Sequence, residues 1–370
     1  MPASATLIPV EDLIETVTSA HPPRPKSPRP IVSIGAGGIV RNAHLPAYAK
    51  AGFPVIAVAD PAPNAAANLA RDFNIAHSFT SVADAIAFAP PDAVFDVAVP
   101  ASQLLNILPL LPNCATVLMQ KPMGENIDEA RAIRHLCRTR DFLAAVNFSL
   151  RYSPNNLEAV ALFNRGFLGE LHDMEVQTRT YTPWQLWTFL ATAPRLEILY
   201  HSIHYLDLVR SWFGNPRGVY CKTVRNPQTA QLAATKSTII LDYGPSRRVL
   251  IATNHAHDFG DRYQHSFAQW EGTAGAARIA MGLNLDYPHG KPDTLEFAQR
   301  GDPAKLWHPL PVLGENFPDA FIGTMGALQA YAEGSTATLP SHYEDAFQTM
   351  ALVEACYRSS EHPAEPLPLE

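Results

Sequence analysis

Ile31-Val32-Ser33-Ile34-Gly35-Ala36-Gly37-Gly38-Ile39-Val40-Arg41 is the stretch that decides the fold. Its first four residues, three of them β-branched, predict a short buried strand. The glycines then predict a tight turn that opens a helix, because a residue without a Cβ can bend sharply and let a ligand approach the main chain. Phosphate oxygens can accept hydrogen bonds from the N–H groups at such a helix start. The residues predicted to bind a dinucleotide here are Gly35, Gly37, Gly38, Ile39 and Val40.

A second apolar run, Val55-Ile56-Ala57-Val58-Ala59, predicts a strand that ends at Asp60. An acid at this place, about 20–25 residues after the first glycine, can hydrogen-bond the ribose hydroxyls of a dinucleotide. Its carboxylate would repel a 2′-phosphate, and no Arg or Lys follows in Pro61-Ala62-Pro63 to hold one. Strand, glycines and acid together predict a site for NAD, with NADP as the less favoured cofactor.

The bulk properties are typical of a cytoplasmic protein of two domains. The chain has 370 residues, of which 47% are hydrophobic and 17% charged, enough apolar side chains for full cores. Its net charge of −7 gives no reason to expect nucleic acid as a partner, and no run approaches the ~20 apolar residues of a membrane span. The four cysteines lack the spacing of a disulfide framework or a metal site, which suits a reducing compartment.

The predicted elements divide the chain into three parts. Residues 1–30 form an N-terminal extension with a proline-rich linker, which either packs on another subunit or is a loosely held tail. Strand and helix alternate over 31–150, which predicts a Rossmann domain, a parallel sheet with helices on both faces. Over 151–370 strands follow one another directly, which predicts an α+β domain with a large, mainly antiparallel sheet. The predicted strands are 31–34, 55–59, 77–79, 94–99, 116–119, 143–148, 170–182, 218–225, 236–243, 248–255, 263–270 and 276–280.

Ligands of a parallel sheet bind at the carboxyl ends of its strands. Lys121 follows the fifth strand, and Pro122 after it fixes φ and removes a donor, so the turn is stiff. The lysine would hold and polarise a hydroxyl or carbonyl oxygen of the substrate; the alternative is an exposed lysine at a strand end. Strand ends also place four residues beside the cofactor: Val99, Pro100, Gln120 and Lys121.

His201 and His204, three residues apart, share one face of the helix predicted over 198–213. His204 is a candidate general acid/base, because histidine titrates near neutral pH. The alternative is a histidine buried and hydrogen-bonded within a helix interface. His201 and His204 could also bind zinc, but no third ligand follows at a suitable spacing, so we predict no metal site.

A polar and aromatic pocket is predicted around the substrate. Aromatic faces suit the C–H faces of sugars, and amide or guanidinium groups suit their hydroxyls. The alternative for each such residue is ordinary packing between domains. The candidates are Asn147, Arg151, Trp184, Trp187 and His201.

After residue 30 the chain resembles the glucose–fructose oxidoreductase/inositol dehydrogenase family of NAD(P)-dependent oxidoreductases over nearly its whole length. The resemblance implies a Rossmann domain and a C-terminal domain with a large open sheet that forms a subunit interface, hence a homodimer or homotetramer. It also implies that Lys121 orients a substrate oxygen while His204 takes the hydroxyl proton. The matching motifs are Gly35-Ala36-Gly37-Gly38-Ile39, His44-Leu45-Pro46-Ala47, Val58-Ala59-Asp60-Pro61, Lys121-Pro122-Met123-Gly124, Ile203-His204-Tyr205-Leu206-Asp207 and Glu344-Asp345-Ala346.

Two positions depart from the family pattern. Gln120 stands where the family usually has a glutamate, and Tyr200 stands where it often has an aspartate. Tyr200 and His201 are therefore further candidates for proton transfer. The resemblance implies an NAD-dependent dehydrogenase acting on a hydroxyl of a sugar, sugar acid or polyol. The alternatives are an oxidoreductase that retains NAD(P) and catalyses a net isomerisation or epimerisation, and a catalytically inactive NAD-binding regulatory protein.

Overall fold

The computed structural model describes residues 7–287 and 289–367. The protein consists of two compact units, and each combines segments that are distant in sequence. Unit 1 comprises Met1–Ile14, Leu162–Leu310 and Ala351–Glu370, whereas unit 2 comprises Glu15–Ala161 and Pro311–Met350. These limits differ from those of the three predicted parts, because residues 311–350 join the N-terminal unit.

Unit 2 contains a six-stranded sheet in the order β3-β2-β1-β4-β5-β6. All neighbouring strands in it are parallel, as predicted for a Rossmann domain. The central strands are buried, which explains their unbroken apolar runs. The order reverses between β1 and β4, and ligands of such sheets bind at this switch point. The strands are β1 Ile31–Ile34, β2 Val55–Ala59, β3 His77–Phe79, β4 Val94–Val97, β5 Thr116–Met119 and β6 Leu143–Val146.

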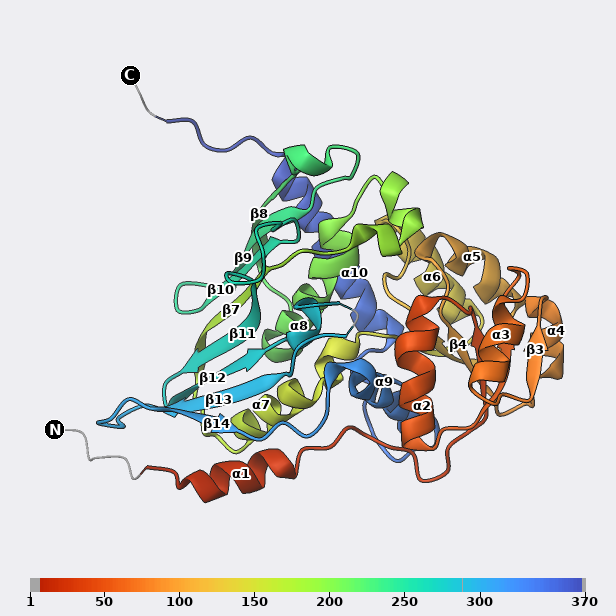
Figure 1. The fold of residues 1–370 in the computed structure, drawn as a ribbon, viewed down its shortest axis with the longest axis horizontal. Coiled ribbons are helices and arrows are strands. Elements are labelled where there is room, and N and C mark those ends of the chain that lie inside the picture. The colour runs from red at the N-terminus through yellow and green to blue at the C-terminus, as the bar shows by residue number, and fades with distance from the viewer. Residues whose placement is uncertain (1–6, 288, 368–370) are drawn as a thin grey trace. The chain divides into compact units, whose positions relative to one another are not determined.

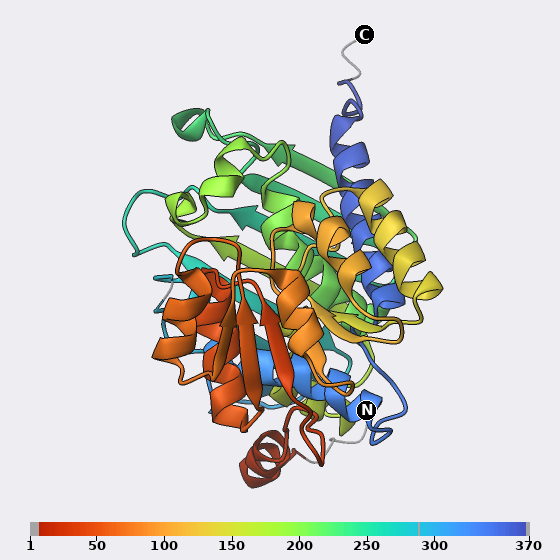
Figure 2. The ribbon, with the colours of Figure 1, turned by 90° about the vertical axis from the view of Figure 1, so that its right-hand side faces the viewer.

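Helices cover both faces of this sheet (Figures 1 and 2). The long helix α9 is buried over 319–330 and packs on α2 and on the π-helical segment η1, within one apolar core. A helix that is apolar on most sides suits this buried position. The helical segments are η1 Val40–His44, α2 Leu45–Ala51, α3 Ala65–Asp72, α4 Val82–Phe88, α5 Leu104–Ile107, α6 Ile127–Thr139 and α9 Asn316–Ala332.

The proline-rich residues 21–30 are extended, as predicted, and they lie along α9 of their own unit. The main-chain N–H of Lys26 donates to Glu333 at 2.7 Å, and that of Arg29 donates to Gln329 at 2.7 Å. A Cβ at Gly326 would lie 2.2 Å from the carbonyl oxygen of Pro23, so glycine permits this close approach. The segment is therefore held against its own unit and is not a loose tail, whereas its packing on another subunit stays a prediction.

Unit 1 contains an eight-stranded sheet in the order β14-β13-β12-β11-β7-β10-β9-β8. Its neighbours are antiparallel except for the parallel pair β7 and β10, which confirms the prediction of a mainly antiparallel sheet. The prediction lacked β13 and β14; β14 contains Pro309, which an edge strand tolerates because it needs fewer donors. The strands are β7 Leu171–Arg179, β8 Gly218–Val224, β9 Lys236–Asp242, β10 Arg248–Asn254, β11 His265–Gly272, β12 Gly275–Ala280, β13 Thr294–Gln299 and β14 Trp307–Leu310.

One face of this sheet is covered by α8 (Ile203–Phe213), which continues from the π-helical segment η7 (Ile198–Ser202). Trp212 of α8 stacks on Trp270 of β11, with ring centroids 4.6 Å apart. The predicted helix over 198–213 is thus present, but its first turn is wider than an α-helix, a feature frequent at functional sites. The remaining α-helices of the described residues are α1 Val10–Thr18, α7 Pro154–Asn164 and α10 Tyr343–Glu361.

The end of α10 closes the β8 edge of the sheet. The main-chain N–H groups of Cys221 and Thr223 donate to the hydroxyls of Ser359 and Ser360, at 2.9 and 3.0 Å. The thiols of Cys221 and Cys356, distant in sequence, are hydrogen-bonded here, and this contact together with burial raises the pKa of Cys356 well above its ordinary value. Both cysteines are free.

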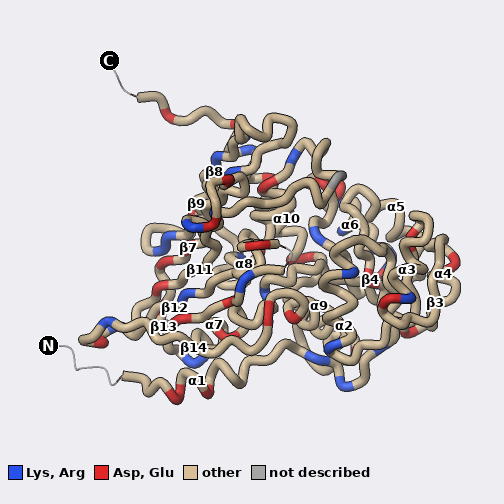
Figure 3. The backbone as a smooth tube through the Cα atoms, in the orientation of Figure 1, with Lys and Arg blue, Asp and Glu red and all other residues tan. Residues whose placement is uncertain are grey.

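Among the residues that the structure describes, no helix combines the length and apolar character needed to span a bilayer. Within residues 7–287 and 289–367, no three His, Cys, Asp or Glu side chains gather to hold a metal ion. Basic and acidic residues are interspersed along the chain (Figure 3).

Candidate active site

The glycine turn joins β1 to η1, as predicted, and its glycines meet different constraints. Gly35 has a φ of +111°, and a Cβ there would lie 2.4 Å from the carbonyl oxygen of Ala98, so glycine is required. A Cβ on Gly37 or Gly38 would meet no atom within 4 Å. The turn therefore borders open space, where the N–H groups of the helix start can face a phosphate.

Ile39 and Val40 contribute their main chains to this turn. Val40 is fully buried in the core of unit 2, and Ile39 packs against that core. Val40 occupies the place of the third glycine of the dinucleotide fingerprint, whose role is helix–strand packing. A buried valine serves that role here.

Asp60 follows β2 and lies against the glycine turn. Its carboxylate accepts hydrogen bonds from the main-chain N–H groups of Ala36, at 2.7 Å, and Ala62, at 2.8 Å. Val99 lies on the other side, next to Gly35, and Pro100 follows it as β4 leaves the sheet. Glycine turn, acid and the end of β4 are thus brought together at the switch point, and they fit the phosphates and ribose of a dinucleotide.

Lys121 lies just beyond β5, at the carboxyl edge of the parallel sheet. Its side chain keeps some solvent exposure, but desolvation lowers its pKa from 10.5 to about 8. The preceding side chain fixes its main chain, because Gln120 Oε1 accepts the Lys121 N–H at 2.9 Å. The lysine is therefore both positioned and close to its titration point at neutral pH.

A buried network that sequence reasoning missed holds Gln120. His44 Nδ1 lies 2.8 Å from Asp96 Oδ2, and both side chains are fully buried. His44 Nε2 lies 3.2 Å from Asn147 Nδ2 and 3.4 Å from Gln120 Nε2. With the amides oriented as this network requires, both amide nitrogens donate, so His44 carries its proton on Nδ1 and donates it to Asp96. The signals for this network were an aspartate inside a buried strand and a histidine in the helix after the glycine turn.

Gln120 is thus a donor to His44 and an acceptor from Lys121. A glutamate at this position would have no amide donor for His44 Nε2. The departure from the family pattern therefore matches the contact that the Gln120 amide makes with His44 in this network.

In unit 1, the predicted proton-transfer residues lie on η7 and α8. Tyr200 is buried, whereas His201 and His204 are half-buried and share a helix face. Every other residue from 198 to 210 is buried, so these two imidazoles form the accessible side of the helix.

Aromatic side chains surround His201. The ring centroid of Trp184 lies 4.8 Å from that of His201, and Trp187 lies 6.4 Å away, both nearly perpendicular. Trp187 also contacts Tyr287 at 5.1 Å. The structure therefore brings together three of the predicted substrate residues, Trp184, Trp187 and His201, and adds Tyr287 to them.

The other two predicted substrate residues lie in unit 2. Asn147 follows β6 and contacts His44, as described. Arg151 donates to the carbonyl oxygen of Pro340 and to Asp345, both at 2.6 Å. Those contacts join the chain after β6 to the start of α10, so its guanidinium already has protein partners.

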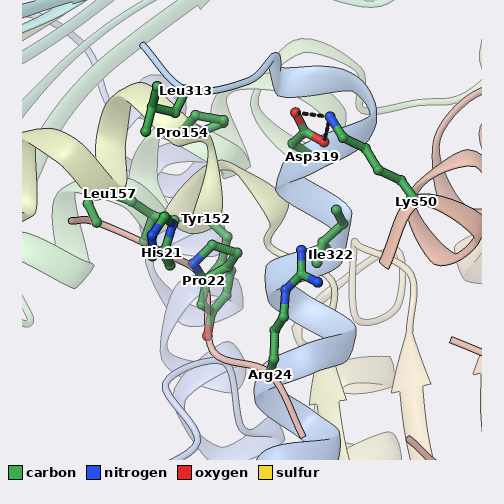
Figure 4. A pocket seen from close by; sticks show the side chains of 11 residues that line it. His21, Pro22, Arg24, Lys50, Tyr152, Pro154, Leu157, Leu313, Asp319 and Ile322 are labelled. Atoms are coloured by element: carbon green, nitrogen blue, oxygen red, sulfur yellow. Dashed lines mark hydrogen bonds and ion pairs between the residues drawn. The ribbon is translucent and has the colours of Figure 1, made fainter. Parts of the chain in front are cut away.

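A separate cavity of about 140 Å³ lies in unit 2 (Figure 4). Residues 20–24 and α9 contribute to its wall, and the ion pair between Lys50 and Asp319, 2.7 Å long, lies at its side. The predicted catalytic, cofactor and substrate residues are not among those that line it. It is therefore distinct from the candidate active site.

The chain matches one family model, the oxidoreductase family with an NAD-binding Rossmann fold, over residues 30–148. This range contains the glycine turn, Asp60 and Lys121. No curated protein matches the sequence.

Solved structures share the fold over about nine-tenths of the chain. An oxidoreductase from Agrobacterium radiobacter, in complex with NAD+, L-tartaric acid and magnesium, is 19% identical with a TM-score of 0.73, covering 90% of this chain and 96% of that one. Aldose-aldose oxidoreductase from Caulobacter crescentus, complexed with glycerol, is 14% identical with a TM-score of 0.76, covering 90% and 98%. The WlbA dehydrogenase from Bordetella pertussis, in complex with NADH and UDP-GlcNAcA, is 16% identical with a TM-score of 0.68, covering 93% and 100%.

Proposed function

We propose that the protein is an NAD-dependent dehydrogenase, because residues 30–148 match the oxidoreductase family with the NAD-binding Rossmann fold. The proposed reaction oxidises a hydroxyl of a sugar, sugar acid or polyol. The observation that carries the proposal is Lys121, whose pKa of about 8 places it near its titration point at the carboxyl edge of the NAD-binding sheet. Groups tuned in this way are typical of active sites.

The cofactor would be held by residues at the switch point of the parallel sheet. The open space at Gly37 and Gly38 accommodates the pyrophosphate, and the N–H groups behind them donate to it. Asp60 is placed to accept hydrogen bonds from the ribose hydroxyls, and its charge disfavours the 2′-phosphate of NADP. Val99, Pro100, Gln120 and Lys121 would then border the rest of the dinucleotide.

Oxidation of an alcohol removes a hydride from carbon and a proton from oxygen. NAD, when bound, supplies the hydride acceptor. The Lys121 ammonium would donate a hydrogen bond to the substrate oxygen and stabilise the negative charge that develops there. His204 would accept the hydroxyl proton, with His201 and Tyr200 as the alternative acceptors.

The aromatic cluster around His201 supports the proposed substrate class. Trp184, Trp187 and Tyr287 offer ring faces and edges of the kind that contact the C–H faces of sugars and polyols. Two solved structures with the same fold were determined with glycerol and with L-tartaric acid. These small polyhydroxy compounds belong to the class that we propose for this protein.

A second copy of the chain is the proposed partner. The sheet face opposite α8 exposes Tyr220, which is 68% exposed, and its cross-strand partner Ile240, which is 45% exposed. Apolar side chains on an open sheet are frequent at subunit interfaces. A homodimer or homotetramer would cover them.

The test is NADH formation, followed by absorbance, with purified protein, NAD and a panel of sugars, sugar acids and polyols. Lys121→Ala and His204→Ala should each lose about 10²–10⁴ of the wild-type rate, as expected for a positioned acid or base. Lys26→Ala and His308→Ala are the matched controls, and they should keep that rate.

The outcomes separate the alternatives. If Lys121→Ala or His204→Ala forms NADH at the wild-type rate, the role assigned to that residue is wrong. Nucleotide that copurifies with the protein, with no free NADH formed, would favour the oxidoreductase that retains NAD(P). Reversible NAD binding with no turnover of any compound would favour the regulatory protein.

A further inference from the structure

Glu197 and His255 form a buried pair in unit 1 that the proposed reaction does not use. Glu197 immediately precedes η7, and His255 immediately follows β10. Their side chains are 0% and 1% exposed, and His255 Nε2 lies 3.4 Å from Glu197 Oε1. Ser202 donates its hydroxyl to the same carboxylate oxygen at 2.6 Å.

The carboxylate of this pair is ionised at neutral pH. Burial alone would raise the pKa of Glu197, but the neighbouring His255 and the hydroxyls of Ser202 and Ser237 outweigh burial, so the pKa lies below its ordinary value. An ionised carboxylate attracts the polar edge of an imidazole, and His255 Nε2 lies within ion-pair distance of it. The other ring nitrogen, Nδ1, lies 2.9 Å from the hydroxyl oxygen of Thr182. The hydrogen bond with Thr182 on one side and the nearby carboxylate on the other hold the plane of the ring.

His255 is in direct contact with His201. The ring centroids are 4.4 Å apart, and the ring planes are inclined at 57°. Trp184 contacts both imidazoles, at 4.8 Å from His201 and 5.9 Å from His255. His201 therefore packs against the fixed ring of His255 and the indole of Trp184, while part of its own surface stays accessible.

We propose that Glu197 and His255 are positioning residues for His201, and that they provide the carboxylate support that Tyr200 cannot. The inference rests on the proposed function, in which His201 is a candidate for proton transfer and substrate contact. A buried charged pair seldom recovers its desolvation cost, so an apolar pair would serve stability at least as well. A carboxylate that orients one imidazole, which in turn orients a partly exposed one, is instead the kind of support that functional histidines have.

The kinetic test uses Glu197→Gln and His255→Gln. Each should lower kcat about 10–100-fold, as loss of an orienting partner does, without changing the KM for NAD. The matched control is Thr178→Val, which removes another buried hydrogen bond of unit 1, that from Thr178 to Tyr205 at 2.9 Å. Thr178→Val should lower stability and leave kcat within about twofold; a comparable loss of kcat in the control would overturn the proposal.

A second readout does not depend on turnover. The ring nitrogens of His201 are followed by ¹⁵N NMR in the full-length protein, with the signals assigned by His201→Asn. Glu197→Gln should shift these signals although residue 197 acts through His255, and Thr178→Val should leave them in place. If the wild type turns over no compound, the proposed function fails, and the ring signals alone decide the positioning role. Unshifted His201 signals in both Glu197→Gln and His255→Gln would overturn it.

Discussion

Replacing Lys121 with methionine should make the folded protein more stable at neutral pH. Methionine keeps a long unbranched side chain and has no charge to desolvate. Desolvation lowers the pKa of Lys121 from 10.5 to about 8, and at about 1.4 kcal/mol for each pH unit this costs the folded state about 3 kcal/mol. Because the side chain keeps some exposure, screening by solvent reduces the expected gain to about 2 kcal/mol.

The gain should shrink as the pH rises. Below about pH 8 the lysine is protonated in both the folded and the unfolded chain, so the wild type bears the full cost. Between about pH 8 and 10.5 the folded lysine is neutral while the unfolded one is still protonated, so the wild type recovers stability relative to the variant. Near about pH 9.5 less than half of the difference should remain.

Urea unfolding of both proteins, followed by circular dichroism at about pH 7 and about pH 9.5, measures these free energies. Lys26→Ala, which removes an exposed lysine of the same unit, should show no such pH dependence. A methionine variant that is less stable at pH 7, or a difference that stays equal at both pH values, would refute the reasoning. The variant should also lose NADH formation, so that stability is gained at the expense of activity.

Four further substitutions test the cofactor site and the residues beside it. Asp60→Asn should weaken NAD binding about 10-fold, because a charged hydrogen-bond acceptor is lost. It should also reduce the preference for NAD over NADP. Calorimetric titration with both nucleotides measures the two affinities. Gly35→Ala should cost about 1–3 kcal/mol of unfolding free energy, because its Cβ would lie 2.4 Å from a carbonyl oxygen at a φ of +111°, whereas Gly37→Ala should fold normally and bind NAD less tightly. Gln120→Glu should raise the pKa of Lys121, because it brings a carboxylate near the ammonium group. The alkaline limb of the pH–rate profile should therefore shift to higher pH. A limb at the same pH as in the wild type would contradict this expectation.

Much of unit 2 could be predicted from sequence because its signals are local. β1 and β2 are buried apolar runs that end in a glycine turn and an acid, and each signal spans only a few residues. The alternation of strand and helix then requires a parallel sheet, and that requirement places Gly35, Asp60 and Lys121 at one edge. In unit 1 the same reading found successive strands but missed β13 and β14, whose short runs of mixed polarity include Pro309.

The buried polar pairs that hold the candidate site in place could not be predicted in this way. His44 and Asp96 are 52 residues apart, and Glu197 and His255 are 58 apart, so no spacing within a helix or strand relates them. From its residue type alone, a histidine or an acidic residue is expected to be exposed or functional. Only the structure shows that the four residues named above are buried.

Composition, periodicity and glycine spacing were therefore enough for the strands, the dinucleotide turn and the cofactor class, because main-chain geometry and side-chain alternation act between near neighbours. Folding decided which polar groups lie together in the interior. A buried ion or amide must find its partners wherever the chain brings them. That condition joins Gln120 to His44, and His201 to Glu197 through His255, across stretches of sequence that carry no sign of the contact.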